Sequence, residues 1–372
     1  MTTTAARELP AFQLLGQPVE ISKIEKELQH LFMDGEDSDS PNAGGVARAS
    51  LINLALYNED QDGLESDASA LAEVTSETAC RSLLLNADTR SRESAARAWV
   101  QVHCQIDRNG KKTVCTEQIS FFLEGDSPGL LRNIVFAHLD SDLPLAFWWR
   151  GEFSDSFEES LYSRIDRLLF DSESWEQPRN QFIRLLEARE ESGSAFVMHD
   201  LAFTRLNSIR HAVANAFDRP QVAKQLSSLS EVQLRYADGF YMSALYLAAW
   251  IAVRLDASFD AGQSRAERLV FTSNRSGSPS SFAVTIASLG EDRKGTVEAD
   301  FQLKEARVEL SRCQTRDFLR TLIHTDDCPS DEDWLPARRL TDVALVTDIL
   351  NRAGRNRTYC TVLPMVQEIL AL

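Results

Sequence analysis

The chain has 372 residues, of which 43% are hydrophobic and 26% are charged, a balance that suits a soluble protein with room for two domains. Its formal net charge of −17 at pH 7 opposes binding to nucleic acid or to an anionic membrane surface, because like charges repel at long range. Neutral or basic protein surfaces are the natural partners. The sequence shows no apolar run of membrane-span length and no signal-peptide pattern, so we expect a cytoplasmic protein.

Motifs that would indicate a cofactor or a metal are missing from the sequence. The six cysteines show no Cys-x-x-Cys spacing, and the six histidines are not placed at metal-ligand spacing. We find no phosphate-cradling glycine loop, no Gly-x-Gly-x-x-Gly, no His-Glu-x-x-His and no Gly-x-Ser-x-Gly. We therefore expect no cofactor, no metal and no nucleotide-binding loop. The sequence does not exclude an enzyme whose active site is assembled from residues that are distant along the chain.

The first half of the chain alternates helical and strand-like patterns. Residues 1–17 read as a flexible lead-in. The elements expected next are a helix at 19–33, a loop at 34–45, a strand at 51–57, a helix at 64–78 and a strand at 80–85. After residue 127 we expect a helix at 128–139, a strand at 145–149, a helix at 157–162, a strand at 167–170 and a helix at 178–191.

Between these groups lies a predicted β-hairpin. Two strand-like runs, Ala95–Asp107 and Lys112–Leu123, flank Asn109-Gly110, a dipeptide that favours a tight hairpin turn. A two-residue turn places Glu117 on the apolar face of the hairpin, opposite Val102. A buried carboxylate needs a partner because an unpaired buried charge is strongly unfavourable. Arg81, in the neighbouring predicted strand, is the candidate partner for an ion pair with Glu117.

The same hairpin register brings two cysteines together. Cys104 faces Cys115, and in a hydrogen-bonded pair of this kind the Cα atoms lie about 5.5 Å apart, within the range of a disulfide. In the cytoplasm we expect two reduced thiols that pack as small apolar side chains. The alternative is a regulatory disulfide, which requires that an oxidant reach one of the sulfurs.

A strand rich in tryptophan is the centre of the predicted first domain. Leu145–Trp149 has no polar interruption, which predicts a strand buried on both faces. Its adjacent tryptophans, Trp148 and Trp149, should point to opposite sides of the sheet. We expect at least one of them to be a core residue, and the other either packs against a helix layer or faces a partner.

Two domains follow from this order of elements. The first, residues 18–192, is α/β with a mixed sheet, and a small polar cluster at Ser192-Gly193-Ser194 marks its end. The second, residues 193–372, is α+β. Its expected elements are helices at 201–217, 240–255 and 340–353, strands at 232–236, 268–272, 281–287, 295–303 and 306–312, and an ending at 363–370. Asp200 is placed to cap the helix that begins at Leu201.

Several short segments resemble, in the same order, the OpcA family of glucose-6-phosphate dehydrogenase assembly proteins. The central one is Asp142-Leu143-Pro144 followed by Trp148-Trp149-Arg150-Gly151. The others are Cys80–Leu85, Ala98-Trp99-Val100 with His103-Cys104, Cys115–Ile119, Asp166-Arg167 with Asp171-Ser172, and Asp200-Leu201 with Thr204-Arg205-Leu206. The resemblance spans residues 80–255 and departs at Phe203 and Ile209, where the family pattern has tryptophans.

The resemblance implies a non-catalytic assembly factor or allosteric activator that binds glucose-6-phosphate dehydrogenase in the oxidative pentose phosphate pathway. Trp148, Trp149, Arg150, Arg167 and Arg205 match the family pattern and become candidate partner-binding or structural residues. Clustered arginines also bind phosphates and carboxylates. A sugar-phosphate-binding protein or an enzyme that uses these arginines is therefore the alternative, and a scaffold module with another partner is a third possibility.

Overall fold

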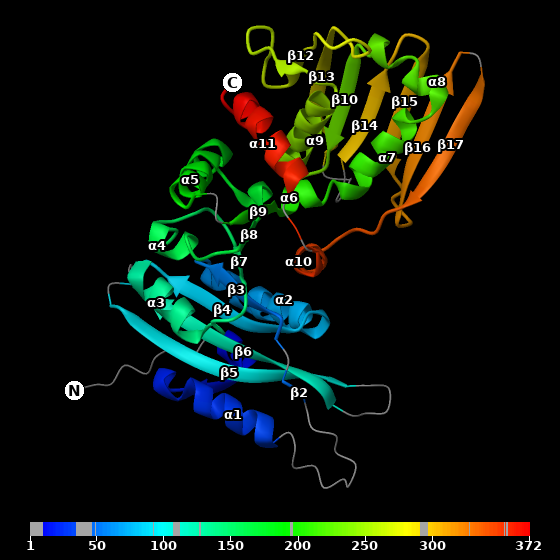
Figure 1. The fold of residues 1–372 in the computed structure, drawn as a ribbon. Coiled ribbons are helices and arrows are strands. Elements are labelled where there is room, and N and C mark those ends of the chain that lie inside the picture. Colours follow the sequence, from blue (N-terminus) through cyan, green and yellow to red (C-terminus); the bar gives the residue numbers. More distant parts are fainter. Residues whose placement is uncertain are drawn as a thin grey trace. The chain divides into compact units, whose positions relative to one another are not determined.

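The chain folds into two compact units in the computed structural model (Figure 1). The structure describes residues 10–34, 47–48, 50–91, 93–106, 112–125, 128–193, 196–290, 297–326, 328–352, 354 and 356–372. The first unit comprises residues 1–170, 184–198 and 342–354. The second unit comprises residues 171–183, 199–341 and 355–372. Each unit carries its own mixed sheet, as the α/β and α+β patterns predict.

The chain passes between the units several times, so the predicted boundary at residue 192 needs correction. Residues 171–183 already belong to the second unit, and residues 342–354 return to the first. The small polar cluster at 192–194 falls within residues 184–198 of the first unit and marks none of these crossings, and Ser194 lies outside the described residues. Composition could not reveal the return, because it depends on the packing of helix α10 (Asp342–Asn351) against helix α2 (Leu64–Glu77).

The sheet of the first unit has nine strands among the described residues, in the order β1-β5-β6-β4-β3-β7-β8-β9 with β2 beside β6. Their bounds are β1 (Gln17–Val19), β2 (Ala47–Arg48), β3 (Ile52–Asn58), β4 (Cys80–Asp88), β5 (Ala95–Ile106), β6 (Lys112–Glu124), β7 (Leu145–Trp149), β8 (Arg167–Phe170) and β9 (Val197–Asp200). The run from β6 through β4, β3 and β7 to β8 is parallel, whereas β5 pairs with β6 as an antiparallel hairpin.

Apolar strands explain why this sheet is covered on both faces. Every residue of β3 and of β7 is buried, as expected for central parallel strands. The helical segments are η1 (Pro10–Leu15), η2 (Ile21–Lys23), α1 (Ile24–Asp34), η3 (Gln61–Gly63), α2, α3 (Pro128–His138), α4 (Glu159–Tyr162), α10 and most of α5 (Pro178–Glu191). Helix α1 packs on β5, while α2 packs on β3, β4 and β5.

The sheet of the second unit has eight strands among the described residues, in the order β11-β12-β13-β10-β14-β15-β16-β17. Figure 1 labels the strands from β12 to β17. Their bounds are β10 (Glu231–Tyr236), β11 (Ser258–Phe259), β12 (Arg268–Thr272), β13 (Ser281–Ser288), β14 (Val297–Gln302), β15 (Ala306–Arg312), β16 (Phe318–Thr325) and β17 (Cys328–Pro336). All neighbours are antiparallel except β10 and β13.

The second unit includes the helical segments η4 (Ser172–Ser174), α6 (Leu201–Thr204), α8 (Pro220–Ala223) and η5 (Leu226–Ser228). Helices α7 (Asn207–Phe217), α9 (Tyr241–Arg254) and α11 (Arg357–Leu370) pack on the second sheet. Alternation along the strands places Val232, Leu234 and Phe301 in the core beneath them. Helix α9, predicted as a buried apolar helix, has ten buried residues among its fourteen.

Several predicted elements differ in the structure. The helix expected at 201–217 is two helices, because Arg205 and Leu206 cap α6 and α7 between them. The helix expected to begin at residue 19 starts at Ile24, after strand β1 and a 3-10 turn. Strands β9, β16 and β17 were not expected. Strand β16 mixes charged and apolar residues and pairs with β15, while β17 is mostly polar and pairs with β16, so both strands become evident only from their pairing.

Candidate functional site

The two tryptophans of β7 are both core residues. Trp148 is 2% exposed and Trp149 is 1% exposed. The Trp149 ring lies 4.5 Å from Tyr57 and 5.4 Å from Phe157, centroid to centroid, and its indole N–H donates to the Glu152 carbonyl at 3.0 Å. The two side chains lie on opposite faces of the sheet because they are adjacent on one strand. Neither tryptophan side chain is exposed in the structure.

Arg150 ends this strand and pairs with a buried acid. Its guanidinium lies 5.4 Å from the Trp148 ring centroid and binds the carboxylate of Asp67 in helix α2. Asp67 is fully buried and also accepts from the Asn58 amide at 2.7 Å. Burial raises the pKa of Asp67, and the charge of Arg150 opposes that rise. The end of β7 is therefore tied to α2 by a charged pair as well as by packing.

The predicted ion pair between Arg81 and Glu117 is present in the structure, at an N–O distance of 2.9 Å. Both residues are buried, at 5% and 1% exposure. The guanidinium also binds Glu25 of helix α1 and donates from Nε to the His138 carbonyl at the end of α3, at 2.6 Å. One cation thus joins strands β4 and β6 to the two helices that cover this face. We call Arg81, Glu117, Glu25 and His138 the arginine cluster.

The four family-matching arginines do not form a common cationic surface. Arg167 donates to the Ile349 and Leu350 carbonyls at the end of α10, at 3.0 and 3.2 Å. Arg205 lies in the second unit and makes a bidentate contact with the carboxylate of Asp171, with one N–O distance of 2.9 Å. Arg81 and Arg150 have the partners described above. Each guanidinium is occupied by protein acceptors, so none is free to bind a phosphate without first losing such a contact.

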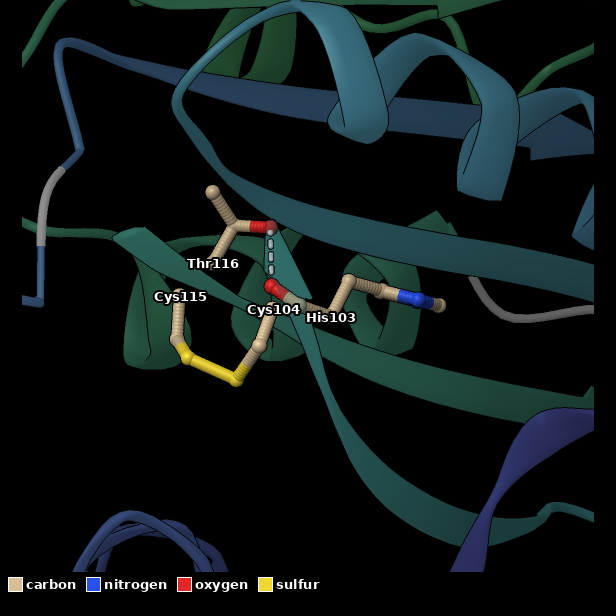
Figure 2. The surroundings of a disulfide bond; sticks show 4 residues. All are labelled: His103, Cys104, Cys115 and Thr116. Carbon is tan, nitrogen blue, oxygen red and sulfur yellow. Dashed lines mark hydrogen bonds between the residues drawn. A yellow bond between two sulfur atoms is a disulfide. The ribbon is translucent and has the colours of Figure 1, made fainter. Parts of the chain in front are cut away.

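The hairpin carries a disulfide between Cys104 and Cys115 (Figure 2). The predicted register is present from Ala95 to Cys104, but the structure replaces the expected pair of reduced thiols with a bond. The Cα atoms are 4.0 Å apart, nearer to the close spacing of a non-hydrogen-bonded pair than to the hydrogen-bonded spacing that we expected. The register then shifts before Ile106, and Asn109-Gly110 lies outside the described residues.

The two cysteines of the disulfide differ in their exposure. Cys115 is 1% exposed, whereas Cys104 is half-buried. Beside the bond, the Thr116 hydroxyl donates to the His103 carbonyl on the paired strand at 3.4 Å (Figure 2). Cys115 lies two residues from Glu117, so the bond and the arginine cluster occupy the same face of the sheet. Whether the disulfide is redox-active stays a prediction.

A second polar cluster, in the second unit, was only partly foreseen. Asp200 caps α6 as predicted, with its carboxylate accepting from the Ala202 N–H at 2.9 Å. The same carboxylate accepts from the Ser172 N–H at 3.2 Å and from the Tyr246 hydroxyl at 2.6 Å. The Tyr246 hydroxyl lies 3.1 Å from that of Tyr359 in helix α11. We call Asp200, Ser172, Tyr246 and Tyr359 the aspartate cluster.

Burial dominates the electrostatics of the aspartate cluster. Asp200 is fully buried, and desolvation, with a smaller contribution from the nearby charge of Asp171, raises its pKa to about 7. Glu173 accepts from the first N–H groups of α9, at Met242 and Ser243, and its pKa also rises to about 7, chiefly because of burial. No local pattern in the sequence joins Asp200 to tyrosines so distant along the chain.

Two family models match the chain, one for each half. The glucose-6-phosphate dehydrogenase subunit N-terminal domain of OpcA matches residues 71–187, and the corresponding C-terminal domain matches residues 197–363. The chain belongs to the OpcA family. The matched ranges contain both polar clusters except Glu25, together with the tryptophan strand and the disulfide. The names of the family associate it with the oxidative pentose phosphate cycle and with assembly of glucose-6-phosphate dehydrogenase.

Curated relatives agree with this assignment. The OxPP cycle protein OpcA of Nostoc punctiforme is 27% identical over 202 residues, which cover 52% of this chain and 42% of that protein. The protein of the same name from Synechocystis is 25% identical over 207 residues, which cover 54% of this chain and 41% of that protein. The matched region therefore spans less than half the length of these relatives.

Similar solved structures are oxidoreductases with very different sequences. An NAD binding oxidoreductase from Klebsiella pneumoniae is 10% identical with a TM-score of 0.47, covering 87% of this chain and 96% of that one. An oxidoreductase from Thermotoga maritima is 8% identical with a TM-score of 0.46, covering 86% and 96%. Likeness at this level carries no information about chemistry. In the described part of the chain, no helix is long and apolar enough to cross a membrane, and no group of three metal-ligating side chains converges.

Proposed function

We propose that this protein is a non-catalytic subunit of glucose-6-phosphate dehydrogenase that binds the dehydrogenase in the cytoplasm and activates it allosterically. The observation that carries the proposal is the match of both family domains, in order, over most of the chain. Activation through binding requires little energy, since a coupling of about 1.4 kcal/mol between partner and substrate already changes affinity tenfold.

The net charge of −17 gives the proposal a physical requirement. A basic or neutral surface on the dehydrogenase is favoured, because complementary charge speeds association and opposes wrong partners. The association rate should therefore fall as salt screens the attraction. The arginine-based alternative, an enzyme or a sugar-phosphate-binding protein, is less favoured because the four guanidinium groups already bind carboxylates or carbonyls within the fold.

The buried tryptophans support an indirect role for the family-matching strand. Trp148 and Trp149 are too buried to contact a partner in this conformation, so we propose that they contribute to binding only through the fold. Truncation of either to alanine should then lower stability and dehydrogenase binding together. A variant that loses binding while its unfolding midpoint is unchanged would place that tryptophan at the interface instead.

The test combines co-elution with kinetics. Purified protein and its cognate dehydrogenase, mixed at micromolar concentration, should elute together from a sizing column. The dehydrogenase should then show a lower KM for glucose 6-phosphate or a higher kcat, and the protein alone should show no turnover. A bovine serum albumin control of similar acidity excludes a general effect of added protein. Intrinsic turnover, or two separate elution peaks with unchanged kinetics, would contradict the proposal.

A further inference from the structure

A cavity in the second unit lies between helical segments and one strand of the sheet. Its volume is about 220 Å³. Its lining comes from α7, α9, the segment around η5 and Phe301 of β14. Apolar side chains dominate the lining. They are Val213, Ala214, Phe217, Leu226, Leu229, Trp250, Ile251, Leu255 and Phe301.

The size of the cavity suits an aromatic ring. An apolar cavity of about 150 Å³ is sufficient to bind benzene. A space of about 220 Å³ therefore admits a phenyl ring together with the first side-chain carbon attached to it. Trp250 is half-buried at the wall, and Phe217 and Phe301 already contact each other edge to face, with centroids 5.1 Å apart. These three rings can make the edge-to-face and stacked contacts that aromatic groups prefer with the ring of a bound ligand.

Two opposite charges stand at the rim of this apolar space. Asp218 follows the last residue of α7, and Arg254 is the last residue of α9, and both are exposed. Within the described residues, neither side chain forms an ion pair or a hydrogen bond. Other arginines of the second unit, such as Arg205 and Arg307, do pair with an acid. A free guanidinium and a free carboxylate beside one apolar cavity complement a ligand that carries both opposite charges and an apolar group.

We propose that this cavity binds a free aromatic amino acid, with phenylalanine as the simplest case. The ring enters the apolar space, the carboxylate accepts from the Arg254 guanidinium, and the ammonium donates to Asp218. Charge-assisted hydrogen bonds of this kind are roughly twice as strong as neutral ones, and both head groups stay at the solvated rim, where little desolvation opposes them. Binding of the amino acid at this site does not require the dehydrogenase.

Calorimetric titration of the full chain with four small probes tests the assignment. The probes are L-phenylalanine, 3-phenylpropionate without the ammonium, 2-phenylethylamine without the carboxylate, and L-alanine without the ring. Phenylalanine should bind at least tenfold more tightly than each of the other three. Equal affinity for all four, or no heat from phenylalanine at millimolar concentration, would overturn the proposal.

Variants assign each part of the ligand to its partner. Arg254→Gln should weaken phenylalanine and 3-phenylpropionate about tenfold and leave 2-phenylethylamine unchanged, because only the first two carry a carboxylate. Asp218→Asn should show the converse pattern. Arg275→Gln, an exposed arginine outside the cavity lining, is the matched control. If a variant weakened the binding of all charged probes equally, the assigned contacts would be contradicted.

A cavity-filling variant separates this site from a docking surface. Ala214 is exposed at the rim, so Ala214→Trp should fill the cavity while leaving the unfolding midpoint near that of the wild type. Phenylalanine binding should then disappear, with co-elution of the dehydrogenase unchanged. Loss of co-elution with no phenylalanine binding in the wild type would identify the cavity as a pocket for a partner side chain and overturn the amino acid site.

Discussion

The arginine cluster of the first unit and the aspartate cluster of the second unit bury polar groups in opposite ways. In the first, a cation lies between two carboxylates and a carbonyl. In the second, a carboxylate accepts from N–H and O–H donors, and the charge that shifts its pKa is that of another acid, Asp171. Paired charges stabilise the arginine cluster, whereas the hydrogen bonds of the aspartate cluster can be made with Asp200 in its neutral, protonated form. They should therefore respond differently to mutation and to pH.

The largest effect should come from removing the cation. Arg81→Met removes the buried cation that pairs with Glu117, and we expect the free energy of unfolding to fall by about 3–5 kcal/mol in urea titrations. Arg90→Met is the control, because that side chain is 84% exposed and should change stability by less than about 0.5 kcal/mol. A combined Arg81→Met and Glu117→Leu variant should recover much of the loss. A single variant as stable as the control would show that the pair is not important to the first unit.

The aspartate cluster should make stability depend on pH. The pKa of Asp200 rises from 3.8 to about 7 on folding, so the folded state holds a proton that the unfolded chain has released. That contribution is fully present below the unfolded pKa and is lost as pH rises toward 7, at about 1.4 kcal/mol per pH unit from this group. The loss is complete above the folded pKa.

Asp200→Asn tests this dependence. The amide oxygen can still accept from Ala202 and Ser172, and the amide N–H can donate to the Tyr246 hydroxyl, so the cluster stays satisfied without a charge. Urea titrations between pH 4 and pH 8 should show a smaller decline than in the wild type. Glu173→Gln should remove a further part, since its pKa is raised in the same direction. An unchanged slope in both variants would mean that these acids stay ionised.

The disulfide allows the first unit to be weakened without changing its charge. A bond that closes so short a loop stabilises a fold by about 3 kcal/mol in the chain-entropy model. Reductant should therefore destabilise the wild type by that order and leave a Cys104→Ser, Cys115→Ala variant unaffected. Differential alkylation with peptide mass mapping would follow the two thiols, and Cys80, whose pKa burial raises to about 12, is an unreactive internal control. If activation of the dehydrogenase changes when the disulfide forms or is reduced, the hairpin is a redox switch. If the two thiols are free in the native protein, the cysteines serve only in packing.

The smallest change in stability should come from a substitution at Arg205 that keeps the charge and alters the contact geometry. Arg205→Lys keeps the charge but loses the bidentate contact with Asp171, and we expect a loss of about 1 kcal/mol. The matched control is Arg235→Lys, because Arg235 makes a single contact with Glu298 at 3.3 Å and is half-exposed. Equal effects in the two variants would show that the planar fork of Arg205 has no special role.

The sequence predicts the arginine cluster better than the aspartate cluster for a physical reason. Hairpin register is a local property, so the positions of Glu117 and Cys115 follow from strand patterns around one turn. Arg81 then follows from the need to neutralise a buried acid. The hydroxyl partners of Asp200 lie on α9 and α11, and only the tertiary packing of these helices brings them to it. The free charges around the cavity were missed for the same reason.

The return of residues 342–354 to the first unit determines when that unit can be completed during synthesis. A ribosome releases the tryptophan strand and the arginine cluster early, yet α10 emerges only after every strand of the second sheet. Until then α2 lacks its neighbour, and Arg167 lacks the carbonyls that it binds in the finished protein. The nascent first unit therefore has part of its surface uncovered, and chaperone contacts should concentrate there. A gene fragment that stops near residue 192 should yield an incomplete, aggregation-prone product.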